Sequence, residues 1–177
     1  MSRLRRTILF AVVAVCAGAA GYGFNLWRMG GDGAGEMGAA ETVMAVRLPD
    51  LRGQSQPLTQ WRGRVLVVNF WATWCTPCRE EIPMFVRLQN KYRAQGLQFV
   101  GIAIDQPDKV QAFSHEFAIN YPILIGGIET VELSRQAGNR IGALPFTVGI
   151  DRNGKIAATQ LGEFKEAKLD AMIHSLF

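Results

Sequence analysis

Cysteine and histidine are scarce in this chain of 177 residues, which has three cysteines and two histidines. A small domain held together by disulfides needs a denser set of cysteines, and a structural zinc site needs about four ligands. Cys16 lies in an apolar N-terminal segment, so the rest of the chain has a single cysteine pair and two histidines far away in the sequence. The composition therefore excludes a disulfide-stapled scaffold and argues against a zinc centre.

The chain also has little excess charge once its first residues are set aside. Its formal net charge is +4, but Arg3, Arg5 and Arg6 precede the apolar segment, and without them 16 basic residues face 15 acidic ones. The remaining charge of +1 provides no basic stripe of the kind that binds nucleic acid. No Lys-Ser or Lys-Thr pair follows the glycine-rich stretch 30–40, which is therefore not a phosphate-binding loop.

Residues 7–27 contain no charged side chain and follow the basic N-terminus. As a helix they would span about 31 Å, close to the ~30 Å hydrocarbon core of a bilayer. Because positive flanking charges stay in the cytoplasm, we expect the rest of the chain outside the cytoplasmic membrane. A cleaved signal peptide is the alternative, since residues 17–19 are small and suit a cleavage site.

The segment after this apolar run is rich in glycine, with five glycines in residues 30–40. Such a composition is typical of a flexible tether. We therefore expect three parts: a signal-anchor or transmembrane helix over residues 1–28, a tether over residues 29–41 and a folded domain over residues 42–177.

Within the folded domain, apolar runs and helical periodicities alternate. The predicted strands cover residues 42–48, 55–58, 65–70, 99–104, 123–125, 145–150 and 155–161. The predicted helices cover residues 77–94, 108–117, 131–137 and 163–176. Residues 151–154 read DRNG, a strong hairpin turn signal. Alternating strands and helices that end in an antiparallel hairpin predict an α/β sandwich with a mixed sheet.

Residues 71–78 read WATWCTPC and place Cys75 and Cys78 where a buried strand ends and a helix begins. The first N–H groups of a helix and its dipole lower the pKa of a thiol at that position. The spacing therefore favours dithiol–disulfide exchange, with metal binding and a purely structural bridge as alternatives. Arg79 stands where the covalent haem motif requires histidine. Pro77 lacks an N–H group that could stabilise a Cys75 thiolate, which predicts a reducing pair.

These residues resemble the membrane-tethered periplasmic thioredoxins of the TlpA/ResA/CcmG type. The similarity includes residues 67–78, Glu81 and Pro83, the loop 142–145 and the hairpin 150–155, and it covers roughly residues 42–177. It implies a thioredoxin-like fold with a central mixed sheet flanked by helices, an N-terminal β-hairpin and a strand-helix insertion at about 105–125. It also implies protein-disulfide reductase activity and, in many members, a role in cytochrome c maturation.

The resemblance assigns roles by position. Cys75 is expected to be the exposed nucleophile, Cys78 the buried resolving thiol, Glu81 the active-site carboxylate and Pro145 a cis-proline that faces the disulfide. The residues expected to contact substrate are Trp74, Thr76, Pro77, Leu144 and Pro145. The residues alone leave alternatives: Glu81 as a first-turn carboxylate stabilised by the helix dipole, and Pro145 as an ordinary proline at a strand start.

Other residues receive weaker or structural assignments. Trp71 suits the core as well as the surface beside Cys75, and we expect Asp105 to be solvated or structural. Two positions depart from the family pattern: Asn69 replaces the buried aspartate of cytoplasmic thioredoxins, and Gly149 replaces a bulky apolar residue.

These expectations combine into a single-pass protein of the cytoplasmic membrane whose catalytic domain lies in the periplasm and needs no metal or organic cofactor. Its expected partners are disulfide-bearing periplasmic proteins, apocytochrome c among them, and a membrane electron donor of the DsbD or CcdA type. A disulfide oxidase or isomerase with the same site is an alternative function. A thiolate copper-binding assembly protein is another.

Overall fold

The computed structural model describes residues 13, 16, 18, 20–23 and 38–177. Chain contacts divide the protein into two units, Met1–Glu36 and Met37–Phe177. The described residues of the first unit are helical. No helix among the described residues is long and apolar enough to cross a membrane. The predicted span over residues 7–27 lies largely outside the described residues, as does most of the predicted tether.

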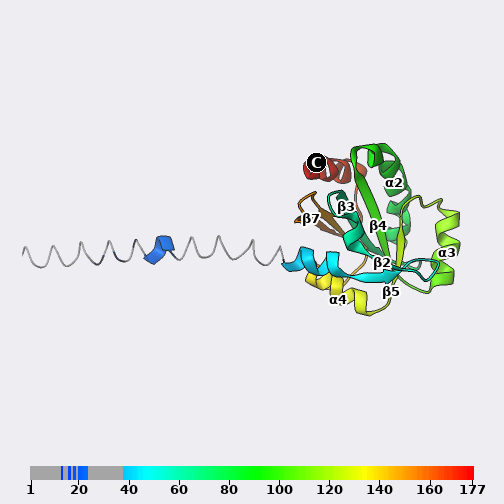
Figure 1. Cartoon of the computed structure of the whole chain (residues 1–177), viewed down its shortest axis with the longest axis horizontal. Helices are drawn as coiled ribbons and strands as arrows, with labels where there is room; N and C mark the ends of the chain where they lie inside the picture. The colour runs from blue at the N-terminus through cyan, green and yellow to red at the C-terminus, as the bar shows by residue number, and fades with distance from the viewer. Residues whose placement is uncertain (1–12, 14–15, 17, 19, 24–37) are drawn as a thin grey trace, which may run out of the picture. The chain divides into compact units, whose positions relative to one another are not determined.

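A five-stranded mixed sheet forms the centre of the second unit, in the order β5-β4-β3-β6-β7 (Figure 1). Strands β4 and β5 run parallel to β3, whereas β6 is antiparallel to β3 and β7 is antiparallel to β6. The strands are β3 (Val65–Trp71), β4 (Leu97–Ile104), β5 (Ile123–Gly126), β6 (Phe146–Ile150) and β7 (Ile156–Leu161). The predicted α/β fold with a mixed sheet is confirmed.

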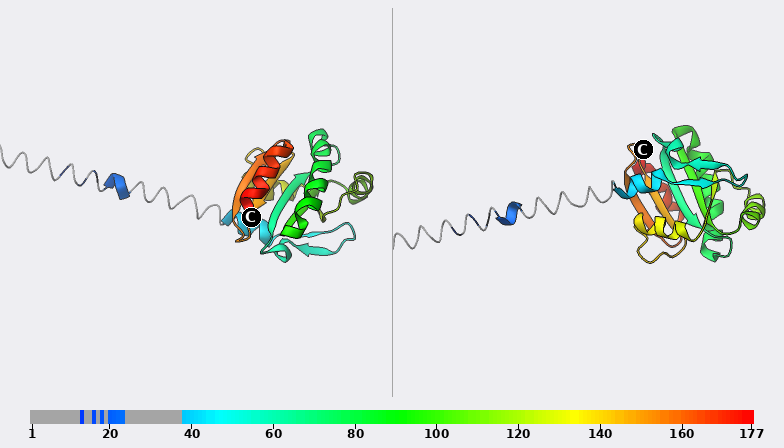
Figure 2. Two further views of the ribbon diagram at one scale, coloured as in Figure 1. Left: turned by 90° about the horizontal axis from the view of Figure 1, so that it is seen from above. Right: turned by 60° about the horizontal axis from the view of Figure 1, so that its bottom comes forward.

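Helices cover both faces of this sheet. They are α2 (Thr76–Tyr92), α3 (Pro107–Glu116), α4 (Glu129–Gln136) and α5 (Glu166–Leu176), with 3-10 turns η1 (Leu58–Trp61) and η2 (Arg93–Gln95). Figure 2 shows α2 and α5 side by side on one face. Residues 38–45 and α4 contribute side chains to the core on the opposite face. Successive side chains of β3 alternate between the two cores, as a strand's period of two requires.

The predicted N-terminal hairpin is present as β1 (Arg47–Pro49) and β2 (Ser55–Pro57), which pair antiparallel. The strand predicted over residues 42–48 is wrong in its first half, because residues 38–45 are helical. Ala40, Val43 and Met44 are buried together in the core, and their spacing of three and four residues fits one face of a helix. The other predicted elements agree with the structure within three residues.

The segment between β4 and β5 corresponds to the predicted insertion, with helix α3 preceding the strand. Strand β5 pairs parallel with the outer side of β4 and so forms an edge of the sheet. The rings of Phe113 and Phe117 stack at a centroid distance of 4.1 Å, and Phe113 also lies 5.1 Å from the Trp71 ring. Trp71 is therefore a core residue that anchors the insertion to the end of β3.

Gly149, where the family usually has a bulky residue, is covered by α5. A Cβ atom at this position would lie 3.0 Å from Leu176 Cδ1 and 3.3 Å from Met172 Sδ. The space of the missing side chain is therefore occupied by two large residues of α5. Although Gly149 departs from the family pattern, strand β6 is buried along its whole length.

Candidate active site

Cys75 and Cys78 form a disulfide at the junction of β3 and α2, with their Cα atoms 5.3 Å apart. Cys75 is the N-cap residue of α2, and no side chain accepts a hydrogen bond from the first N–H groups of this helix. Those groups are thus available to stabilise a thiolate. Cys75 is 6% exposed and Cys78 is 0% exposed, so both residues are buried and Cys75 is the nearer to solvent.

Pro145 lies beside this junction although it is distant in sequence. The Leu144–Pro145 peptide bond is cis, as predicted. Phe146, the first residue of β6, pairs with Phe70 near the end of β3. Leu144 contacts the core cluster that contains both cysteines. The sheet register therefore brings the cis-proline loop to the end of β3 from which the cysteines follow.

The turn before Cys75 is held by the carboxylate of Asp105, which follows β4. The Thr73 N–H group donates to Asp105 Oδ2 at 3.1 Å, and the Thr73 hydroxyl donates to the same oxygen. Burial raises the pKa of Asp105, but the hydrogen bonds from Thr73 and Gln106 outweigh this and hold the pKa below its usual value. Asp105 is therefore structural, one of the two roles expected for it, and it supports the site.

Arg79 follows Cys78 and joins the same turn to the inserted helix. Its Nη1 donates to the Thr73 carbonyl oxygen at 3.4 Å. Its guanidinium carbon lies 5.0 Å from the centroid of the Phe113 ring and 5.4 Å from that of Phe117. The insertion thus contacts the active-site turn through a cation–π pair as well as through Asp105.

Glu81 is buried behind the disulfide, with 1% of its surface exposed. Its Oε1 accepts a hydrogen bond from Asn69 Nδ2 at 3.0 Å, and its Oε2 accepts one from the Phe164 N–H group at 3.1 Å. Burial and, more weakly, the nearby charge of Glu163 raise the pKa of Glu81 to about 7, against these two hydrogen bonds. With this pKa, the Glu81 carboxyl group is close to half-protonated at neutral pH.

The alternative of Glu81 as a first-turn carboxylate is wrong. Helix α2 begins at Thr76, and its first turn contains no acidic residue. Glu81 is in the second turn and points to the interior, three residues after Cys78 on the same face. Tyr121 is its buried neighbour: burial and, secondarily, the Glu81 charge raise the pKa of the Tyr121 hydroxyl above its usual value.

The predicted substrate contacts differ in how far they reach the surface. Of the five predicted substrate contacts, Trp74 is 68% exposed and Thr76 is exposed, Pro77 and Leu144 are half-buried, and Pro145 is buried. Two further residues were missed, Ile128 before α4 at 80% exposure and Ile141 before the cis-proline loop at 69%. Isolated isoleucines in loops have no periodicity, so no sequence signal could have identified them.

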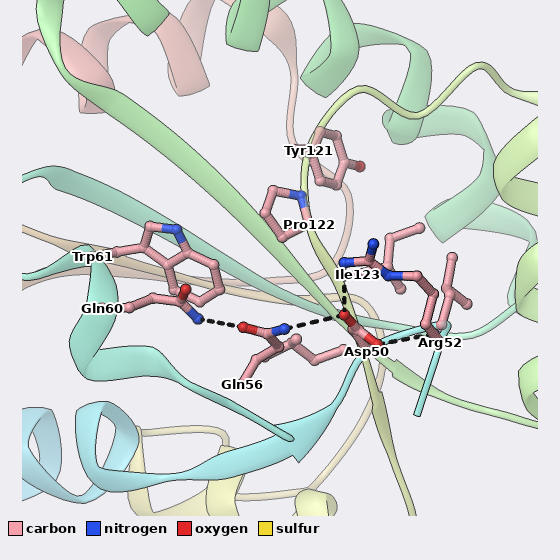
Figure 3. Close-up of a pocket in the computed structure, with 10 residues that line it drawn as sticks. Asp50, Arg52, Gln56, Gln60, Trp61, Tyr121, Pro122 and Ile123 are labelled. Atoms are coloured by element: carbon pink, nitrogen blue, oxygen red, sulfur yellow. Dashed lines mark hydrogen bonds and ion pairs between the residues drawn. The ribbon is translucent and has the colours of Figure 1, made fainter. Parts of the chain in front are cut away.

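A separate hollow of about 400 Å³ lies between the β1–β2 hairpin and the start of β5 (Figure 3). Gln60 donates to Gln56, and Gln56 donates to Asp50, each at 3.1 Å. These polar side chains, which line the hollow, thus form hydrogen bonds with one another. None of the predicted site residues is among the residues that line it.

No group of three or more histidine, cysteine, aspartate or glutamate side chains within the described part of the chain could hold a metal ion. The chemically active groups that the structure brings together are the Cys75–Cys78 disulfide and the buried carboxyl group of Glu81.

Comparison with known proteins shows the family. A sequence model described as Redoxin matches residues 38–173. The chain belongs to the redoxin family. The match covers the disulfide, Glu81 and the cis-proline loop together.

Two relatives and one solved structure show which branch this redoxin resembles. It is 32% identical to the thiol-disulfide oxidoreductase ResA of Geobacillus thermodenitrificans over 73% of this chain and 72% of the relative. It is 24% identical to ResA of Bacillus thuringiensis over 97% of this chain and 98% of the relative. A thiol:disulfide interchange protein of the thioredoxin family from Chlorobium tepidum matches with a TM-score of 0.68 and 28% identity, covering 74% and 92% of the two chains.

This redoxin is accordingly a thioredoxin-like protein of the TlpA/ResA/CcmG type and a protein-disulfide oxidoreductase.

Proposed function

We propose that this redoxin reduces disulfides in other proteins. The observation that carries the proposal is the Cys75–Cys78 disulfide at the start of α2, with Cys75 the more exposed sulfur. In the reduced protein the Cys75 thiolate attacks a substrate disulfide, forms a mixed disulfide and releases one substrate thiolate. Cys78 then attacks Cys75 Sγ, which frees the second substrate thiol and restores the Cys75–Cys78 bridge.

Glu81 is positioned to handle the proton that this cycle requires. Cys78 must lose its proton before it attacks and must regain one when the bridge is reduced again. Glu81 lies one helical turn after Cys78 on α2, and burial raises its pKa to about 7. A carboxyl group near half-protonation can both accept and return a proton at neutral pH.

The direction of electron flow follows from how well the site stabilises a thiolate. Pro77 is in the first turn of α2 and has no N–H group to offer the Cys75 sulfur. Fewer donors leave the reduced form less stabilised, which makes the pair a better electron donor.

The reduction potential of the Cys75–Cys78 pair tests this direction. We expect a value below about −200 mV at pH 7, measured by equilibration with dithiothreitol buffers and thiol alkylation. A value near about −120 mV would make the protein an oxidase, and one near about −180 mV would suit an isomerase. Either result contradicts the proposed reductant.

We also infer that the domain works in the periplasm, tethered to the cytoplasmic membrane. Three arginines followed by 21 uncharged residues support this topology, and the similarity to Bacillus thuringiensis ResA extends into the N-terminal region. A reductant in an oxidising compartment needs a source of electrons, for which a membrane donor of the DsbD or CcdA type is suited. Cytochrome c maturation is the role implied by the TlpA/ResA/CcmG resemblance.

The substrate is a polypeptide that offers apolar side chains beside its disulfide. Among residues 38–177, which the structure describes, the exposed large apolar residues are Trp74, Ile128, Ile141, Leu161 and Phe177. The first four are near the disulfide end of the sheet. Leu161 pairs with Phe146 beside Pro145, and Ile128 follows the end of β5, whose last pair joins Gly126 to Ile104. Exposed apolar side chains gathered at one end of the sheet in this way are typical of a binding surface.

Serine at both Ile128 and Ile141 should weaken this contact without altering the disulfide. We expect kcat/KM for insulin reduction to fall about tenfold, mainly through KM, because two apolar contacts are lost. Reduction of oxidised glutathione should be unchanged, since so small a substrate does not reach these residues. The control is Phe177→Ser, whose ring lies by Arg152 beyond the opposite end of β6. Equal losses for both substrates would contradict a docking role.

A further inference from the structure

Asn69 occupies the centre of a buried polar cluster and has one atom without a partner. Its Nδ2 group donates both of its hydrogens, one to Glu81 Oε1 and one to Thr147 Oγ1, each at 3.0 Å. Its Oδ1 atom is buried and accepts no hydrogen bond. Asn69, Glu81 and Thr147 are each at most 1% exposed. An unpaired carbonyl oxygen in such a place is costly, so the arrangement requires an explanation.

This arrangement suits only one protonation state of Glu81. As a carboxylate, Glu81 accepts at both oxygens, from Asn69 Nδ2 and from the Phe164 N–H group. A protonated Glu81 has an O–H group that must donate. The Phe164 N–H group can only donate, so the proton belongs on Oε1, where it would meet the Nδ2 hydrogens of Asn69. The protonated state therefore needs an acceptor where the amide now presents a donor.

Turning the amide over supplies that acceptor. The torsion that reorients an asparagine amide is broad and roughly two-fold. After the turn, Oδ1 accepts from the Glu81 O–H group and from the Thr147 hydroxyl, which can donate as readily as it accepts. Nδ2 then occupies the former position of Oδ1 and has no hydrogen-bond partner there. Each state leaves one amide group unpaired, the carbonyl oxygen when Glu81 is charged and the NH₂ group when Glu81 is protonated.

We propose that the Asn69 amide is a two-position element that turns over when Glu81 gains or loses a proton. Asn69 thereby acts as a positioning residue, because it binds Glu81 in both protonation states without titrating itself. A buried aspartate at this position would instead add a second ionisable carboxyl group to the cluster. The inference rests on the proposed role of Glu81 as the proton-exchanging group.

The protonation state of Glu81 also affects strand β6, which follows the cis-proline, because Asn69 is hydrogen-bonded to Thr147 in that strand. Thr147 is directly opposite Asn69 in the sheet and lies two residues after Pro145. Turning the amide reverses the direction of the Asn69–Thr147 hydrogen bond. The charged and titratable groups around Glu81 are Glu163 after β7 and Tyr121 before β5, since Cys78 on its own helix is held in the disulfide and does not titrate. Burial raises the pKa of Glu81 itself to about 7.

The test is an NMR titration of the oxidised full-length protein from pH 5 to pH 9, with no substrate present. We expect the side-chain amide signals of Asn69 to move with the same midpoint as the Glu81 carboxyl carbon. The nuclear Overhauser contact between the Nδ2 hydrogens and the Thr147 methyl group should be strong at pH 9 and weak at pH 5. Asn69 signals that stay fixed while Glu81 titrates would overturn the proposal.

A Glu81→Gln variant provides the second arm, since glutamine is a neutral donor like the protonated acid. Its side-chain oxygen accepts from the Phe164 N–H group, and its NH₂ group donates to Asn69 Oδ1. We expect the Asn69 signals of this variant at pH 9 to match those of the wild type at pH 5. Signals that match the wild type at pH 9 would contradict the turn. Because neither arm involves electron transfer, both are independent of whether the protein is a reductant.

Discussion

A Cys78→Ser variant is expected to accumulate as a mixed disulfide with its substrates, while turnover falls by about a thousandfold or more. Cys75 can still attack a substrate disulfide in this variant. Resolution fails because the second sulfur, which is buried beside Cys75 in the first turn of α2, is gone. Trapping in the host and separation by non-reducing electrophoresis measure the effect and identify the substrates.

Two matched variants sharpen this prediction. Cys75→Ser should lose turnover to the same extent but should form no mixed disulfide, because the more exposed nucleophile is absent. Cys16→Ser removes the third cysteine of the chain and should keep full activity. If Cys75→Ser trapped substrates as well as Cys78→Ser does, the assignment of nucleophile and resolving thiol would be wrong.

A Glu81→Gln variant is expected to remove a pH dependence of folding stability. Burial raises the pKa of Glu81 from 4.5 to about 7 in the folded protein. The folded state therefore binds this proton more tightly than the unfolded state does. The stabilisation is complete below the unfolded pKa and is lost as the pH rises through the folded pKa. For Glu81 alone, this amounts to roughly 3 kcal/mol lost between pH 4.5 and pH 8.

Urea denaturation of the oxidised wild type and of Glu81→Gln at pH 5 and pH 8 measures this loss. The free energy of unfolding of the wild type should fall relative to that of the variant as the pH rises. Since other groups titrate alike in both proteins, the difference isolates Glu81. A constant difference across this range would show that Glu81 keeps its ordinary pKa in the folded protein.

Much of the fold was predictable because its signals are local. The apolar run that forms β3 is long and buried on both faces, and the hairpin turn at residues 151–154 has its expected residues. The strand predicted over residues 42–48 failed because a short apolar run fits a strand or a buried helix equally well. Contact of Ala40, Val43 and Met44 with the core decided in favour of the helix.

The cysteine pair of the candidate site was predictable for the same reason. Cys75 and Cys78 are close in sequence, and their place between a strand and a helix follows from local patterns. The cis bond before Pro145 was expected from the resemblance alone, since nothing in its immediate sequence distinguishes it from an ordinary proline at a strand start. Asp105, Ile128 and Ile141 received no active role, because their relation to the site depends on the order of strands across the sheet.

The sequence by itself thus determined the cysteine pair, its place at a strand–helix junction, and the alternation of elements that builds a mixed sheet. These depend on spacing and periodicity over a few residues. Only the tertiary structure decided that Asn69, Glu81 and Thr147 meet in one buried cluster. The reason is physical: a carboxyl group acquires a raised pKa from the water it loses and the partners it gains, and packing between distant segments sets both.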